Sequence, residues 1–116
     1  MIELAVSTTA VCPVADIPLE GGVAALVEGR AVALFRSFDG SVFALSNIDP
    51  FSGASVLSRG IVGSRGEVPV VSSPMYKQAF DLRTGACLDD AAVRVTAYDV
   101  AVVDGVVHVG RAREAT

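Results

Sequence analysis

Short apolar runs separated by glycine-containing turns recur along almost the whole chain. The pairs Glu28-Gly29, Asp39-Gly40 and Asp104-Gly105 each stand between two runs that are rich in Val and Ala. Such pairs favour tight β-hairpins, because Gly, and to a lesser degree Asp, tolerate a positive φ. No segment of helical length carries the 3.6-residue apolar period of an amphipathic helix. The pattern therefore predicts an all-β antiparallel sandwich or barrel.

The expected strands follow one another with few interruptions. They cover residues 7–13, 23–27, 30–37, 42–46, 61–64, 68–71, 80–82, 93–98, 100–103 and 106–109. In 30–37, alternation should direct Ala31, Ala33 and Phe35 to one face and the residues between them to the other. A chain of 116 residues is expected to form a single domain, residues 1–116, ordered at about 5–110 and with a frayed tail at 111–116.

Composition narrows the classes of function. The net charge is −4 and the Lys and Arg residues are scattered, which argues against a nucleic-acid-binding face. No apolar run approaches the roughly 18 residues that a membrane span needs, and no basic segment follows Met1. We therefore expect a cytoplasmic protein with neither nucleic acid nor membrane as a partner.

Two segments carry the most specific pattern in the chain. Residues 47–60 read N-I-D-P-F-S-G-A-S-V-L-S-R-G, and residues 70–88 read V-V-S-S-P-M-Y-K-Q-A-F-D-L-R-T-G-A-C-L. The second segment resembles the cluster loop C-P-x-H-x-x-x-F-D-L-x-T-G of a Rieske iron–sulfur domain, with Ser73 at the cysteine position and Tyr76 at the histidine position. The first segment resembles the other cluster loop, with Asn47 and Asp49 at its two ligand positions.

The side chains at these four positions do not supply the ligands of a Rieske centre. Such a centre needs two Cys and two His, because thiolates hold one iron and imidazoles the other. The whole chain contains two Cys and one His. We therefore expect no metal site, no cofactor-binding residue and no catalytic residue. Asn47, Asp49, Ser73 and Tyr76 would either hydrogen-bond to one another across the two loops or face a solvated pocket.

The remaining sulfur and imidazole groups lie outside both loops. Cys12 and Cys87 are far apart in sequence and form no C-x-x-C motif, which favours buried thiols, with a surface redox thiol or a disulfide as the alternative. His108 alternates with valines in the last expected hairpin. This position favours a solvent-facing strand residue over a catalytic histidine.

Apolar side chains in the two loops indicate a docking surface. Pro50, Phe51, Met75, Tyr76 and Lys77 are candidates for contact with a partner protein, because aromatic and Met side chains are favoured at the centres of interfaces. The alternative is that Phe51 and Met75 pack into the core beneath the loops.

Over residues 11–109, and most specifically in 47–63 and 69–88, the chain resembles the small subunit of bacterial assimilatory NAD(P)H-dependent nitrite reductase. The resemblance implies a Rieske-like fold in which the cluster ligands are replaced. It also implies a large-subunit partner that carries FAD, an iron–sulfur cluster and siroheme and reduces nitrite to ammonium in nitrate assimilation. A free-standing Rieske-like ferredoxin and a β-domain that serves another oxidoreductase are the alternatives.

Overall fold

The computed structural model describes residues 8–113, and almost all of its regular elements are strands. The strands are β1 (Thr9–Pro13), β2 (Gly21–Val27), β3 (Arg30–Arg36), β4 (Val42–Ser46), β5 (Ile61–Arg65), β6 (Val68–Ser72), β7 (Ala79–Asp81), β8 (Ala97–Val103) and β9 (Val106–Ala112). Two single-turn 3₁₀-helices, η2 (Val14–Asp16) and η3 (Leu57–Arg59), complete the described elements. Neither of these helices has the length and apolar content needed to cross a membrane.

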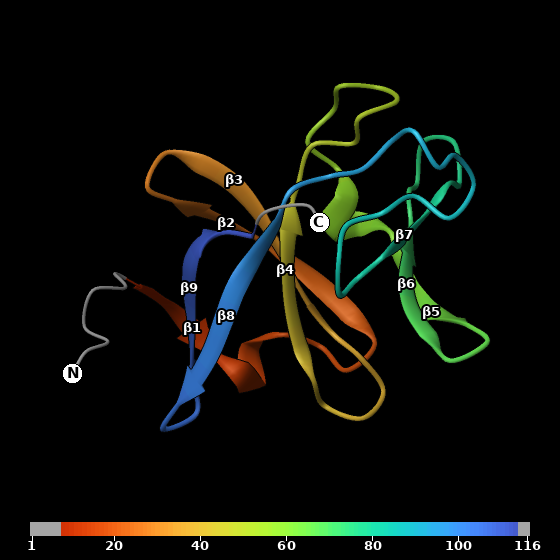
Figure 1. The fold of residues 1–116 in the computed structure, drawn as a ribbon. Helices are drawn as coiled ribbons and strands as arrows, with labels where there is room; N and C mark the ends of the chain where they lie inside the picture. Colours follow the sequence, from red (N-terminus) through yellow and green to blue (C-terminus); the bar gives the residue numbers. More distant parts are fainter. Residues whose placement is uncertain (1–7, 114–116) are drawn as a thin grey trace.

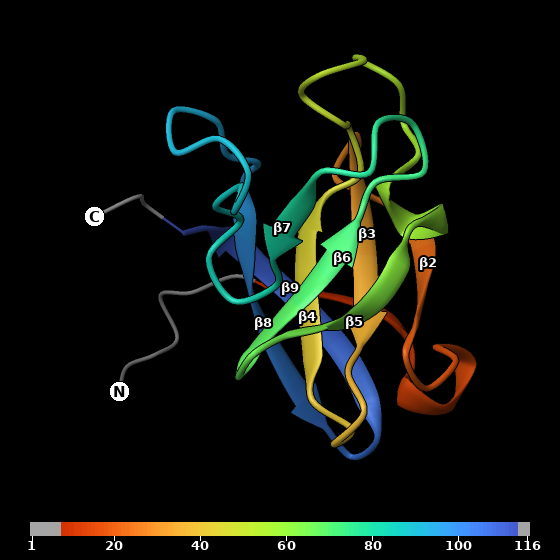
Figure 2. The ribbon, with the colours of Figure 1, turned by 90° about the vertical axis from the view of Figure 1, so that its right-hand side faces the viewer.

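Two antiparallel sheets form the fold (Figure 1). The larger sheet has the strand order β1-β9-β8-β4-β3-β2, and it curls until its edge strands β1 and β2 approach each other. The smaller sheet has the order β5-β6-β7 and lies against the outer face of β3 and β4 (Figure 2). The prediction of an all-β antiparallel architecture is confirmed.

Tight turns set the register of the larger sheet. Glu28 and Gly29 have φ values of 50° and 81°, and Asp104 and Gly105 have φ values of 53° and 78°. Two consecutive positive φ values are typical of the type I′ turn, whose twist matches that of the strands on either side. The paired residues next to these turns, Val27 with Arg30 and Val103 with Val106, confirm both predicted hairpins.

Strand β3 is buried on both faces and separates two hydrophobic cores. Its Ala33 and Phe35 belong to an outer core between the sheets, and its Val32 and Leu34 belong to an inner core enclosed by the curled sheet. The outer core comprises Ala33, Phe35, Leu45, Leu57, Val62, Val71, Phe80, Leu82, Cys87, Val95 and Ala97. The inner core comprises Ile17, Val27, Val32, Leu34, Ala44, Tyr98, Val107 and Val109. The predicted alternation along this strand is therefore correct.

The segment before β8 differs from the sequence prediction of a strand over 93–98. Strand β8 begins only at Ala97 and continues to Val103 past an irregularity between Tyr98 and Val100. Residues 93–96 lie instead against the turn that follows β7, because Val95 N donates a hydrogen bond to the Gly85 carbonyl oxygen at 2.9 Å.

The end of the described chain also differs from the prediction. Strand β9 extends to Ala112, and Arg113 N donates to the Ala97 carbonyl oxygen at 2.7 Å, so residues 111–113 are bonded to the sheet. Residues 114–116 of the expected tail, and residues 5–7 of the expected ordered part, lie outside the described residues.

The two thiols belong to different cores, and Cys12 and His108 lie on the paired strands β1 and β9. Cys87 is buried in the outer core and Cys12 is half-buried on β1, and both are free thiols, so the disulfide alternative is wrong. Burial, and then the carboxylate of Asp16, raises the pKa of the Cys12 thiol. His108 is half-buried on β9, with its Nδ1 atom 3.5 Å from the Thr8 hydroxyl oxygen.

Gly85 provides a test of how the chain packs around the end of β7. Gly85→Ala should lower the free energy of unfolding by about 3 kcal/mol or more, because strain at positive φ adds to a severe clash. The φ of Gly85 is +83°, and an added Cβ would clash with the Val95 carbonyl oxygen. Gly105→Ala is the control, since its φ is +78° but no atom lies within 4 Å of its added Cβ. This control should cost only about 1 kcal/mol. Urea denaturation measures both, and equal losses would contradict the close approach to Val95.

Candidate functional site

Two loops lie side by side at one end of the molecule, at the upper edge of Figures 1 and 2. The first runs from 47 to 56 between β4 and η3, and the second runs from 73 to 78 between β6 and β7. We refer to these two loops together as the tip. The sequence pattern assigns all four degenerate ligand positions to it.

Asn47 organises the first loop from within. It is buried, with 3% of its surface exposed, and both ends of its side-chain amide are bonded. Its Nδ2 donates to the Ser55 hydroxyl at 2.9 Å, and its Oδ1 accepts from Ser58 N at 2.7 Å. The sequence pattern did not identify the two serines, because either could equally face solvent in a loop of this composition. Asn47 therefore shapes its own loop and does not join it to the second.

Asp49 and Ser73 join the two loops directly. Both residues are almost fully buried, at 0% and 1% exposure. The Ser73 hydroxyl donates to Asp49 Oδ2 at 2.5 Å, and Asp49 Oδ1 accepts from Phe51 N at 2.8 Å. The Ser73 oxygen also accepts from Met75 N at 3.2 Å. A buried carboxylate is tolerated when donors satisfy its oxygens, and here one of those donors comes from the opposite loop.

Tyr76 does not take part in this contact. It lies in the second loop and is 58% exposed, so the phenol faces solvent. Of the four degenerate positions, the structure brings Asp49 and Ser73 together, places Asn47 within the first loop, and leaves Tyr76 at the surface. Direct bonding between the loops, one of the two alternatives drawn from the sequence, therefore rests on a single pair.

The backbone closes the second loop tightly beneath Tyr76. Ser73 N donates to the Gln78 carbonyl oxygen at 2.9 Å, and Lys77 N donates to the Ser73 carbonyl oxygen at 3.0 Å. Lys77 has a φ of 67°, which is uncommon for a residue with a side chain. These bonds hold the loop in a sharp reversal that leaves Met75, Tyr76 and Lys77 exposed.

Phe51 and Met75 separate into core and surface. Phe51 is half-buried beneath the first loop, with its ring centroid 6.2 Å from that of Phe80 in the outer core. Met75 is 47% exposed. The core alternative is therefore right for Phe51 and wrong for Met75.

The remaining candidates for partner contact form an exposed tip surface. Pro50, Met75, Tyr76 and Lys77 are all exposed, and Ile48, at 39% exposure, adds an apolar side chain that the sequence pattern did not single out. Ile48 lies one residue after the buried Asn47, and alternation along the start of the loop turns it outward. The tip surface is thus mainly apolar, with Lys77 as its cation.

Two carboxylates hold β7, the strand that leads away from the tip. Asp89 accepts from Ala79 N at 2.8 Å and pairs with Arg65 at 3.0 Å, and both partners lower the pKa of its carboxyl group. For Asp81, burial acts to raise the pKa, but the side-chain and backbone donors of Arg83 outweigh it and the pKa is lowered. Both groups thus remain ionised at neutral pH and keep their partners in place.

Comparisons with known proteins agree with this geometry. The family model described as a Rieske-like [2Fe-2S] domain matches residues 7–110. The nitrite reductase (NADH) small subunit of Salmonella typhimurium is 46% identical over 99 residues, which cover 84% of this chain and 92% of that protein. The solution structure of the Escherichia coli protein NirD has a TM-score of 0.84 at 41% identity and covers 91% of this chain and 97% of that one.

A further relative is much longer than this chain. The large subunit of nitrite reductase [NAD(P)H] from Klebsiella oxytoca is 45% identical over 101 residues. The match covers 87% of this chain but only 10% of that protein.

The tip does not fit the [2Fe-2S] cluster in the description of the matched family. An amide and a hydroxyl, those of Asn47 and Ser73, stand where two thiolates would be required. Both oxygens of Asp49 and the hydroxyl of Ser73 are already engaged with protein donors. Cys87 is part of the outer core and belongs to neither tip loop. The donors are thus the wrong kind, and those present serve the fold.

Ser73→Ala tests whether the contact between the loops stabilises the protein. Removing the hydroxyl leaves the buried Asp49 carboxylate one donor short, so the free energy of unfolding should fall by about 1–3 kcal/mol. Ser52→Ala is the matched control, because among residues 8–113 its hydroxyl accepts a single hydrogen bond, from Ala54 N at 3.2 Å within the first loop. The control should lose less than about 0.5 kcal/mol. Chemical denaturation compares the two variants. A loss of unfolding free energy that is no larger for Ser73→Ala than for Ser52→Ala would show that the bond between the loops does not stabilise the protein.

Proposed function

Because the chain belongs to the Rieske-like [2Fe-2S] domain family and, within it, to the nitrite reductase (NADH) small subunits, we propose that it is the non-catalytic small subunit of an assimilatory NAD(P)H-dependent nitrite reductase. Its partner is a large chain that carries FAD, an iron–sulfur cluster and siroheme and reduces nitrite to ammonium in the cytoplasm. One observation carries the proposal: the 46% identity extends over 92% of a nitrite reductase small subunit.

The relative from Klebsiella oxytoca supports a large chain as the partner. A protein named as the large subunit contains, in one polypeptide, a segment that is 45% identical to this chain. Joining two modules in one chain raises their effective concentration and favours contact between them. The same pair of modules in separate chains would then meet through surfaces that each already possesses.

The tip surface is the docking face in this proposal. Exposed Met75 and Tyr76 are the kinds of side chain that anchor interfaces, and the loop that presents them is fastened from below by Ser73. A preorganised loop loses less conformational entropy on binding than a mobile one. The geometry thus favours recognition of a protein surface.

A role without a bound cofactor is supported by the donor atoms of the tip. The buried polar atoms of Asn47, Asp49 and Ser73 hydrogen-bond to protein groups. Without thiolates and imidazoles at these positions, electron transfer would depend on the cofactors of the large chain. The small subunit then contributes a binding surface to the complex and no redox group.

Iron content tests the absence of a cluster. Protein purified without oxygen should show no visible absorbance bands and no iron above background, with a cluster-containing Rieske ferredoxin handled in parallel as the positive control. About two irons per chain, the content of a [2Fe-2S] centre, would contradict the proposal and favour a ferredoxin.

Tyr76→Asp tests the docking face. Affinity for the purified large chain should fall by about tenfold or more, because a charge would replace an aromatic anchor in a desolvated contact. Leu19→Asp is the control: Leu19 is 56% exposed, close to the 58% of Tyr76, but it lies in the turn before β2. Calorimetric titration gives both affinities. Equal affinities for the two variants would count against the tip, and failure of the unmodified chain to bind would refute the partnership.

A further inference from the structure

The end of the molecule opposite to the tip is acidic. The turns and the 3₁₀-helix in the lower part of Figure 1 each contribute a carboxylate. These residues are Asp16, Glu20, Asp39, Glu67 and Asp104. Within residues 8–113 none of them forms an ion pair, since the ion pairs there involve Asp81, Asp89 and Asp99.

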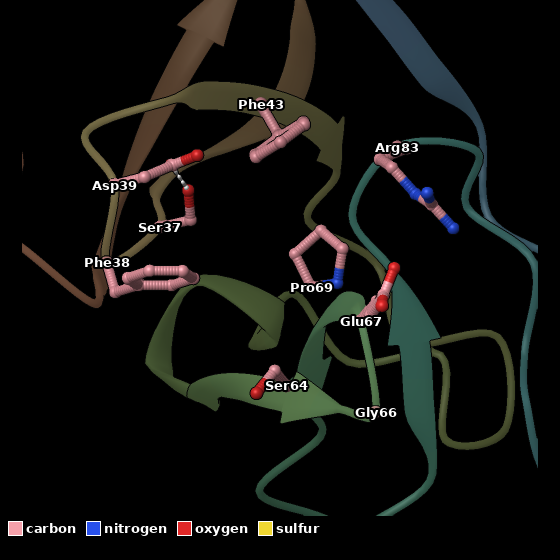
Figure 3. Close-up of a pocket in the computed structure, with 9 residues that line it drawn as sticks. All are labelled: Ser37, Phe38, Asp39, Phe43, Ser64, Gly66, Glu67, Pro69 and Arg83. Carbon is pink, nitrogen blue, oxygen red and sulfur yellow. Dashed lines mark hydrogen bonds between the residues drawn. The ribbon is translucent and has the colours of Figure 1, made fainter.

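A groove of 460 Å³ crosses this end between the β3–β4 turn and the β5–β6 turn (Figure 3). Its apolar walls are Phe38, Phe43 and Pro69, which come from both sheets. Phe38 is 70% exposed and therefore presents most of an aromatic ring to solvent. The volume lies within the roughly 300–1,000 Å³ that is typical of binding pockets.

The charges around the groove are predominantly negative. Asp39 and Glu67 line it, and the one cation in its lining, Arg83, is already paired with Asp81 through its Nε and Nη2 atoms at 3.1 and 3.0 Å. The Ser37 hydroxyl, followed by the Ser41 backbone N–H, lowers the pKa of Asp39, so this carboxylate keeps its charge at neutral pH. Aromatic and proline walls flanked by unneutralised carboxylates suit an apolar side chain that is next to a cation.

We propose that this groove is a second docking site for the large chain, and that it accepts a segment with an apolar side chain beside Lys or Arg. This inference rests on the proposed function, because the large chain is the partner. The tip and the groove lie at opposite ends of a molecule with extents of 41 × 27 × 26 Å. A partner that engages both must extend along the smaller sheet. A protein many times longer than this module, such as the relative of which it covers 10%, has the size to do so.

Charge substitution in the groove gives the first test. The double variant Asp39→Asn with Glu67→Lys replaces two negative charges by one positive charge, and the asparagine oxygen can still accept the bonds that Asp39 accepts from Ser37 and Ser41. The matched control is Asp104→Asn with Glu20→Lys, which changes the net charge equally at the same end but outside the groove. Affinity for the purified large chain is measured at low and at physiological ionic strength.

The groove variant should bind about tenfold more weakly at low salt and should lose most of the salt dependence of binding. The control should stay within about twofold of the unmodified chain, because its charges act on the partner only from a distance. Melting temperatures confirm that both variants fold.

Phe38→Ser supplies a second test that leaves the charges unchanged. It should weaken binding several-fold without altering the salt dependence, because it removes an apolar wall and no carboxylate. Since Phe38 is mostly exposed, the substitution should not affect folding.

If the groove variants bind like the control, with the same salt dependence, the inference is wrong while the partnership stands. If the unmodified chain does not bind the large chain at all, the proposed function fails first. A loss of affinity confined to Tyr76→Asp would assign docking to the tip alone and would also overturn the second site.

Discussion

The hydrogen bond between Ser73 and Asp49 is the constraint on which the arrangement of the tip depends. It is the direct side-chain link between two loops that are 24 residues apart in sequence. The Ser73 hydroxyl oxygen also accepts a hydrogen bond from Met75 N. The group that links the two loops therefore also fixes the position of Met75, where the exposed part of the second loop begins. A buried carboxylate lacking such donors would cost several kcal/mol, so the pair stabilises one closed arrangement over open ones. The apolar surface above it therefore stands on a rigid base.

Strand β7 connects the tip with the groove at the other end. It begins directly after the second loop, and its last residue, Asp81, holds Arg83 at the edge of the groove. All three residues of this strand are buried, and Phe80 packs against Phe51 of the first loop. The smaller sheet thus joins two surfaces of different character, one apolar with a cation and one aromatic with carboxylates.

The sequence predicted the parts of the fold that local chemistry determines. The hairpins at 28–29 and 104–105 were predictable because the glycine of each pair adopts positive φ at low cost, and β3 because alternation assigns each side chain to a face. The late start of β8 was not predictable from local sequence, since it depends on a hydrogen bond from Val95 to Gly85 across an intervening loop. Local sequence patterns also could not predict which polar residues of the tip would contact one another. Asp49 and Ser73 touch only because both loops leave the same end of the packed sheets. The groove, which draws its walls from both sheets, left no signal in any single segment.

The residues that match the Rieske pattern around Ser73 have reasons to be present that do not involve iron. Phe80 packs in the outer core, and Asp81 pairs with Arg83. Gly85 adopts a positive φ, and its lack of a Cβ leaves room for the carbonyl group of Val95. The Thr84 hydroxyl accepts from Ala86 N and steadies the same turn. These contacts belong to folding, and they would persist whatever occupies the ligand positions. The fold alone therefore does not identify the function of this chain, and the exposed surfaces of the tip and the groove are the place to look for it.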